Sequence, residues 1–268
     1  TCAVRIARAL PVAIAAAALA GAPASHAQQS AATIEAAAEA LGMVRGVQRR
    51  MDSINTVEFT GTGTLSVPEP GGSWTQYAVT SVTVGMSYHI PALRWDMSRA
   101  GADGAGERTI HVVNGVRAWN ERQPGVDAEP VDGGVAERRR QIWLTPHGII
   151  RAAVEAEAQS PGSVTVATEN GRTTLAVVVD AERFVVTLDA NSRPERVATT
   201  IEHPLLGRTR LEAVYSGYVD WPLLDVYFPS RIVQTLGEHT ILDLTITEFF
   251  QNPYVVFPTP EQLARSQP

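Results

Sequence analysis

The residue types that most often do chemistry in proteins occur here mainly as scattered single side chains. None of the six histidines has another histidine within five residues, so the sequence holds no local metal-binding motif of paired histidines. The absence of lysine from the whole sequence excludes Schiff-base chemistry. Neither a Gly-x-Ser-x-Gly elbow nor a phosphate-binding glycine loop followed by lysine is present. We therefore predict no catalytic residue, no metal ligand and no cofactor for this chain.

Aromatic side chains make a better case for a binding function. Four tryptophans each lie in an amphipathic segment, and some of them must face the space between sheet and helices: Trp74, Trp95, Trp119 and Trp143. In one interpretation they simply fill the core, and in the other they line an apolar pocket, where a ligand of such a fold would lie. His147 either contacts that ligand or hydrogen-bonds a nearby backbone carbonyl at the start of a helix. The candidate ligand-binding residues are therefore Trp143, His147, Trp95 and Trp119.

The distribution of charge excludes one large class of partners. The net charge is −6, and every basic residue is arginine. The one basic run, Arg138-Arg139-Arg140, is interpreted as the solvated face of a helix. A negative domain without basic clusters binds nucleic acid poorly, so we expect no nucleic-acid partner.

The N-terminal residues 1–27 have the pattern of an export signal. Arg5 and Arg8 precede an unbroken apolar run from Leu10 to Ala20, and small residues, Ser25 and Ala27, stand three and one positions before the expected cleavage point. The apolar run is shorter than the roughly 20 residues that a transmembrane helix needs, although a retained N-terminal anchor is the alternative. We expect a mature protein in the bacterial periplasm or outside the cell, without a transmembrane segment. Its lack of cysteine beyond Cys2 fits the periplasm better than a disulfide-rich extracellular scaffold.

Two stretches have the three-to-four-residue apolar period of helices. The first runs from Ala32 to about Ile54, with Gly42 and Gly46 as points where the helix could break. The second, over 135–158, contains Thr145-Pro146, which reads as the N-cap and first residue of a new helix. We therefore predict two helices, 135–144 and 146–158, with a kink between them.

Most of the remaining chain alternates between apolar and polar residues, as half-buried strands do. Gly61 and Gly63 within the first strand favour strong curvature, and a change of phase near Ser81 indicates a bulge in the second. Asn114-Gly115 and Asn170-Gly171 predict hairpins with type I′ turns. Because a curved antiparallel sheet must cover its apolar concave face, and the helices are the only elements available, we expect them to fill it.

The predicted fold is therefore α+β and mainly antiparallel β. It is a strongly curved open or half β-barrel of about ten or eleven strands, covered by an N-terminal helix and a kinked helical pair. The expected organisation is a signal peptide over 1–27, one curved-sheet domain over 28–250, and a proline-rich tail or linker over 251–268.

Several segments resemble the N-terminal, non-catalytic domain of periplasmic hydrolases with the metallo-β-lactamase fold. The resemblance rests on RRRQIWLTPHG at 138–148, YSGYVD at 215–220, FPSRIVQ at 228–234, LDLTIT at 242–247, and Ala118-Trp119-Asn120. That domain is similar to the periplasmic lipoprotein-carrier fold, an open β-barrel with a helical lid, which implies a capacity for acyl chains. The His-x-His-x-Asp-His zinc motif of the hydrolases is absent from this sequence, so none of their metal ligands has a counterpart here.

Three hypotheses about function follow. The first is a periplasmic, non-catalytic binding module for a hydrophobic or lipid-like small molecule or for a partner protein. The second is a fragment or accessory subunit of a metallo-β-lactamase-fold zinc hydrolase, whose catalytic domain or subunit would be the partner. The third is a structural domain with a solid core and only protein partners. The volume of the pocket separates the first from the third.

Overall fold

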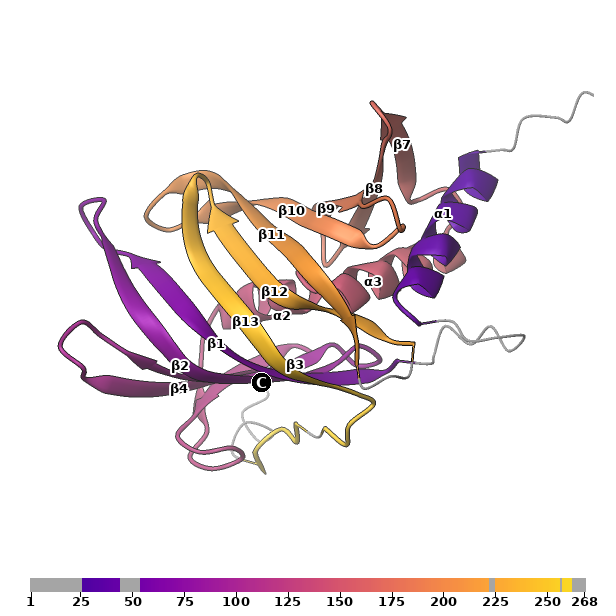
Figure 1. Ribbon diagram of the computed structural model, residues 1–268. Helices are drawn as coiled ribbons and strands as arrows, with labels where there is room; N and C mark the ends of the chain where they lie inside the picture. The colour runs from indigo at the N-terminus through magenta and orange to yellow at the C-terminus, as the bar shows by residue number, and fades with distance from the viewer. Residues whose placement is uncertain (1–25, 44–53, 222–224, 256, 262–268) are drawn as a thin grey trace, which may run out of the picture.

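The computed structural model describes residues 26–43, 54–221, 225–255 and 257–261 (Figure 1). Residues 1–25 of the predicted signal segment therefore lie outside the described residues. Residues 44–53 of the first predicted helical stretch also lie outside them. None of the described helices is long and apolar enough to cross a lipid bilayer.

The described strands form one antiparallel sheet of 13 strands, in the order β6-β5-β4-β3-β2-β1-β13-β12-β11-β10-β9-β8-β7. Figure 1 shows this sheet curling strongly around the helices, which confirms the predicted curved, open half-barrel. The sheet has more strands than the predicted ten or eleven, and the two-residue edge strand β6 is one that the sequence pattern did not indicate. The strands are β1 (Thr56–Pro68), β2 (Trp74–Ser87), β3 (Ala92–Ala100), β4 (Gly106–Asn114), β5 (Arg117–Glu121), β6 (Glu129–Pro130), β7 (Thr165–Glu169), β8 (Arg172–Val179), β9 (Glu182–Leu188), β10 (Pro194–His203), β11 (Gly207–Asp220), β12 (Tyr227–Leu236) and β13 (His239–Gln251).

The topology is a meander with one long-range pairing in its middle. Each strand pairs with its neighbours in sequence, except that β1 and β13 pair with each other and β6 and β7 form the two edges. The segment between these edges contains the helices α2 (Gly134–Trp143) and α3 (Pro146–Gln159). The kinked pair therefore crosses the open side of the sheet from one edge to the other, as Figure 1 shows.

Glycines and bulges produce the curvature. A Cβ atom added at Gly63 would lie 1.8 Å from the Asp243 carbonyl oxygen, and one at Gly61 would lie 2.6 Å from the Thr245 carbonyl oxygen. At these two positions β13 approaches β1 more closely than any other residue type allows. The β1–β2 register shifts between Gly61 and Gly63, and the β2–β3 register shifts beside Ser81, which confirms the predicted bulge.

The two predicted hairpins are both present, but their turns differ. At Asn170 and Gly171 φ is 52° and 75°, the two positive values that a type I′ turn requires. In the β4–β5 hairpin Asn114 instead pairs with Arg117 in the strand ladder, so the two turn residues are Gly115 and Val116. The prediction of a type I′ turn at Asn114-Gly115 is therefore wrong. The Asn114 side chain is held by its amide, which donates to the Phe257 carbonyl at 2.6 Å.

The helices begin and end at recognisable signals. The helix α1 (His26–Ala40) begins earlier than the predicted 32–54 stretch and stops at Gly42, whose φ is 76°. Gly42 and Met43 donate to the Glu39 and Ala38 carbonyls, which is the bonding of a Schellman C-cap. For α3, the Thr145 hydroxyl accepts from the Gly148 amide at 3.2 Å and Pro146 is the first helical residue, as predicted.

Two apolar clusters lie on opposite faces of the sheet. The larger one fills the space between the concave face and the three helices. The smaller one lies on the outer face, where Ile110, Val112 and Trp119 are covered by Phe257. Part of the predicted C-terminal tail thus packs on the outer face of the sheet.

Candidate ligand-binding trough

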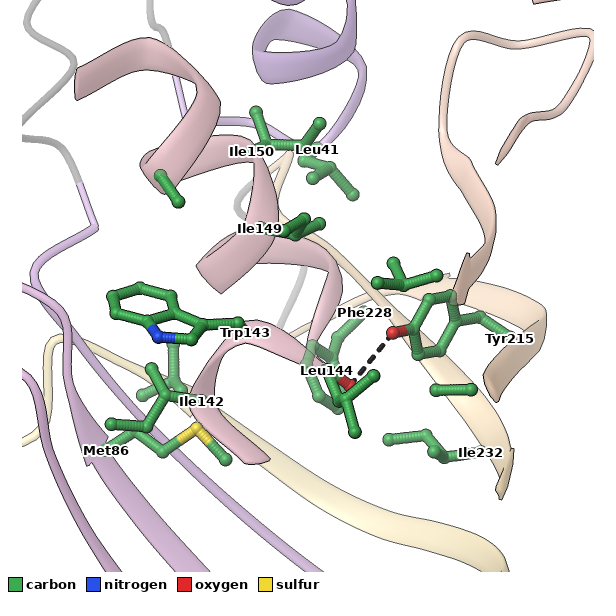
Figure 2. Close-up of a cluster of buried hydrophobic side chains, with 14 of the residues drawn as sticks. Leu41, Met86, Ile142, Trp143, Leu144, Ile149, Ile150, Tyr215, Phe228 and Ile232 are labelled. Carbon is green, nitrogen blue, oxygen red and sulfur yellow. Dashed lines mark hydrogen bonds between the residues drawn. The ribbon is translucent and has the colours of Figure 1, made fainter. Parts of the chain in front are cut away.

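The concave space is packed solid where α2 ends and α3 begins. Trp143, Leu144 and Ile149 point from this kink toward strands of the surrounding sheet (Figure 2). The Tyr215 hydroxyl donates to the Leu144 carbonyl at 2.8 Å, drawn as the dashed line in Figure 2. The Tyr88 and Thr145 hydroxyls lie 3.3 Å apart in the same buried region. Burial raises the pKa of Tyr88 and Tyr215, so both phenols stay neutral hydrogen-bonding groups.

His147 belongs to this packed region. Its ring lies 5.9 Å from each of the Phe228 and Phe249 rings, measured between centroids. Its Nε2 lies 3.3 Å from the Leu41 carbonyl oxygen, so the imidazole joins α3 to the end of α1. Burial lowers the pKa of His147 to about 4, whereas the bond to Leu41 acts in the opposite direction. His147 is therefore a neutral core residue at neutral pH.

A trough of about 520 Å³ remains open beside α2. The strands β1, β3 and β13 supply most of its apolar wall, and α2 and β4 supply most of its polar wall. Its lining residues come from the same end of the sheet. Antiparallel pairing places the end of β1 beside the start of β13, and it places the end of β3 beside the start of β4. The apolar lining consists of Leu65, Leu93, Trp95, Met97, Val131, Ile241 and Leu242.

The charged groups of the polar wall are largely satisfied by protein partners. Arg99 donates to Glu107 at 2.8 Å. Arg138 donates to the Val112 carbonyl at 2.9 Å and to the Trp119 carbonyl at 2.5 Å, so it holds α2 against the β4–β5 hairpin. Both guanidinium groups of the polar wall therefore have hydrogen-bond acceptors within the protein.

Two further polar groups shape the inner part of the trough. Gln234 in β12 donates to Gln141 in α2 at 2.8 Å, and this bond ties the helix to the sheet. Burial, and then the charge of Arg138, lowers the pKa of His111, so its ring is neutral at neutral pH. The inner trough therefore offers neutral hydrogen-bonding groups next to an apolar wall.

The structure separates the four residues that the sequence suggested. Trp95 lies half-buried in the trough. Trp143 lies at the kink, where its Nε1 donates to Asp180 at 2.7 Å, and His147 is enclosed in the core. Trp119 lies on the outer face and donates to Glu121 at 2.8 Å. Trp95 is therefore the one member of the predicted set that lines the trough.

The aliphatic residues of the trough were not singled out from the sequence. Leu93, Trp95 and Met97 alternate along β3, and this period-two pattern was the available signal that they share a face. Leu65 and Leu242 become neighbours only through the β1–β13 pairing, which no local pattern indicates.

The described residues show no group of three or more His, Cys, Asp or Glu side chains that could hold a metal ion. No family model and no curated protein matches the chain in sequence. Among solved structures, the chain is similar to the LolA superfamily protein NE2245 from Nitrosomonas europaea. The TM-score is 0.43 and the sequence identity 12%, over 87% of this chain and 96% of that one. At this identity the likeness concerns the fold alone, and the association with metallo-β-lactamase-fold hydrolases stays a prediction.

Proposed function

We propose that this chain is an exported, non-catalytic binding module whose trough beside α2 holds an apolar, lipid-like molecule. The observation that carries the proposal is the trough itself, with its seven apolar side chains and its volume of about 520 Å³. That volume falls within the roughly 300–1,000 Å³ of ligand-binding pockets, and apolar walls with a few polar groups are their usual lining.

The shape of the free space limits the ligand. The kink region is filled by the stacked rings of Phe228 and Phe249, whose centroids are 4.3 Å apart, so the apolar part of a ligand ends there. The outer part of the trough carries the Arg99–Glu107 pair, beside which a polar head group can stay hydrated. An amphiphile with one acyl chain matches this arrangement.

The proposal is tested by displacement of a dansylated undecanoic acid from the purified protein. Thr109, in β4, lines the trough. The substitution Thr109→Phe places an aromatic ring in the space that the acyl chain of the probe would occupy. We expect this variant to bind the probe at least about tenfold more weakly, because several methylenes lose their apolar surroundings at about 0.8 kcal/mol each.

The matched control is Thr62→Phe, which adds the same ring to an exposed position of β1. It should bind the probe as the unchanged protein does. Absence of probe binding by the unchanged protein, or equal binding by both variants, would contradict the proposal and favour a purely structural domain.

A further inference from the structure

Arginines on the outer face of the sheet are in most places matched with single carboxylates on nearby strands. These interactions are bidentate and short, which is the geometry in which a guanidinium group and a carboxylate interact most strongly. The matched pairs are Arg94–Glu121, at 3.0 and 3.2 Å, Arg108–Asp96, at 2.8 and 2.6 Å, and Arg231–Asp243, at 2.9 and 2.7 Å.

The part of the outer face formed by β9, β10 and β11 departs from this rule. Here Arg196 and Arg210 share a single carboxylate, that of Glu212, at 2.9 and 2.6 Å. Because Glu212 is buried under both guanidinium groups, one negative charge is enclosed by two positive ones. The Arg210 side chain keeps 59% of its surface exposed, so part of its hydrogen-bonding capacity faces solvent.

Two more arginines of this region have no carboxylate partner. Arg183 in β9 and Arg208 in β11 form no ion pair within the part of the chain that the structure describes. Glu202 stands opposite Arg208 in the β10–β11 register, yet no ion pair joins the two side chains. Four arginines thus stand against two carboxylates on a protein whose net charge is −6.

The two unpaired arginines and Arg210 border a hollow. Arg183, Arg208 and Arg210 line a depression of about 370 Å³ on the outer face. Its lining includes Thr200, directly opposite Arg210 in the register, and the small buried residue Ala198, which leaves room between the longer side chains. A hydroxyl group and the guanidinium groups therefore surround one space with hydrogen-bond donors.

We propose that this depression, defined by Arg183, Thr200, Arg208 and Arg210, binds a phosphate group. Guanidinium groups bind phosphate oxygens in pairs of parallel hydrogen bonds, and a phosphate dianion supplies the negative charge that the cluster lacks. The site lies on the opposite face of the sheet from the trough, so it is independent of the ligand proposed there. A phosphate group could come from a soluble monoester, which is close to a dianion at neutral pH, or from a lipid head group, whose diester is a monoanion. Both present anionic phosphate oxygens to the guanidinium groups.

The test is isothermal titration calorimetry of the full chain with inorganic phosphate and with glycerol phosphate at low ionic strength. The variant Arg183→Gln/Arg208→Gln removes the two unpaired charges from exposed positions, where the fold does not depend on them. We expect it to lower the association constant for phosphate at least about tenfold. Binding by the unchanged protein should weaken as salt is added, because exposed charges are screened.

The control is Arg108→Gln/Arg231→Gln, which removes the same charge from the same face but from matched pairs. It should change the association constant less than about twofold, apart from the general effect of net charge. Flotation with vesicles of phosphatidylcholine, with and without phosphatidylglycerol, separates the two sources. Flotation that needs both phosphatidylglycerol and the two arginines assigns the site to a head group, and phosphate binding without flotation assigns it to a soluble ester. Absence of both, or equal losses in the two double variants, overturns the proposal.

Discussion

The hydroxyl of Tyr215 in β11 donates a hydrogen bond of 2.8 Å to the carbonyl of Leu144, the residue at which α2 ends. A helix end leaves its last carbonyls without partners inside the helix, and this one is buried away from water. Strand β11 thus supplies the hydrogen-bond donor that the Leu144 carbonyl lacks within the helix, and this bond fixes the position of the kink. Tyr215→Phe should lower the free energy of unfolding by about 1–3 kcal/mol, since it leaves a buried carbonyl unsatisfied.

Urea denaturation followed by circular dichroism measures this loss. The comparison is Tyr254→Phe, which removes a hydroxyl from a side chain that is 95% exposed and should leave the unfolding midpoint unchanged. An equal midpoint for both variants would show that the kink does not depend on Tyr215.

A second prediction concerns Gly148, just inside α3. A Cβ atom added there would lie 2.1 Å from the Ile142 carbonyl oxygen, which is backbone and cannot move without shifting the end of α2. Gly148→Ala should therefore destabilise the protein by about 1–3 kcal/mol, as overpacked positions do.

Gly106→Ala is the matched substitution in β4, where the nearest atom to an added Cβ lies 4.0 Å away. Thermal unfolding should show a lower midpoint for Gly148→Ala and no loss for Gly106→Ala. A Gly148→Ala protein with the original midpoint would mean that α2 and α3 are not held rigidly at the kink.

The third prediction is a dependence of stability on pH. Burial lowers the pKa of His147 from 6.5 to about 4, so the unfolded chain binds a proton at His147 more readily than the folded one. The free energy of unfolding should therefore fall as the pH drops from about 6.5 toward 4, by about 3 kcal/mol in total from His147. Above about pH 6.5 the contribution of His147 should not change with pH. His111, whose pKa is also lowered by burial, contributes with the same sign.

His147→Phe separates the two histidines, because it keeps a ring beside Phe228 and Phe249 but does not titrate. Unfolding free energies measured in urea at pH 5 and pH 7 should differ less for this variant than for the unchanged protein. The same difference in both proteins would assign the pH dependence to other groups.

The fourth prediction concerns ligands of the trough. If methylenes enter its apolar wall, each added pair should lower Kd roughly tenfold, up to the length at which the space is full. Displacement of the dansylated probe by decanoate, tetradecanoate and octadecanoate measures this. A Kd independent of chain length would mean that the acyl chain stays outside the trough.

The fold was largely predictable because its signals are local. Thr145-Pro146 marks the start of α3 in the sequence as clearly as in the structure, where Thr145 caps the helix. Alternation likewise defines the strands, and the phase change near Ser81 coincides with a register shift. The start of the first helix was placed less well, because α1 begins at His26, inside the segment assigned to the export signal, whereas its end at Gly42 coincides with a predicted break point.

The site was predictable only in part, because alternation defines two faces of a strand without telling which is concave. Trp95 and Trp119 lie in equally regular strands, but the register places Trp95 opposite His111 and Trp119 opposite Val112. These partners are adjacent in β4 and therefore face opposite sides of the sheet. The prediction that the helices fill the concave face of the sheet is confirmed at the kink between α2 and α3. Beside α2 the trough remains open.

The pairing of β1 with β13 determines when the protein can fold. The hydroxyls of Thr60 and Thr247 meet across this pairing at 3.0 Å, although 187 positions separate them in sequence. Contacts between such distant residues form slowly, because a long loop must close before they contribute any stability. Until β13 has been made and has reached the place where the chain folds, β1 therefore has one side without hydrogen-bond partners. For that time it is an exposed edge to which another chain can add, and the newly made polypeptide needs protection from aggregation.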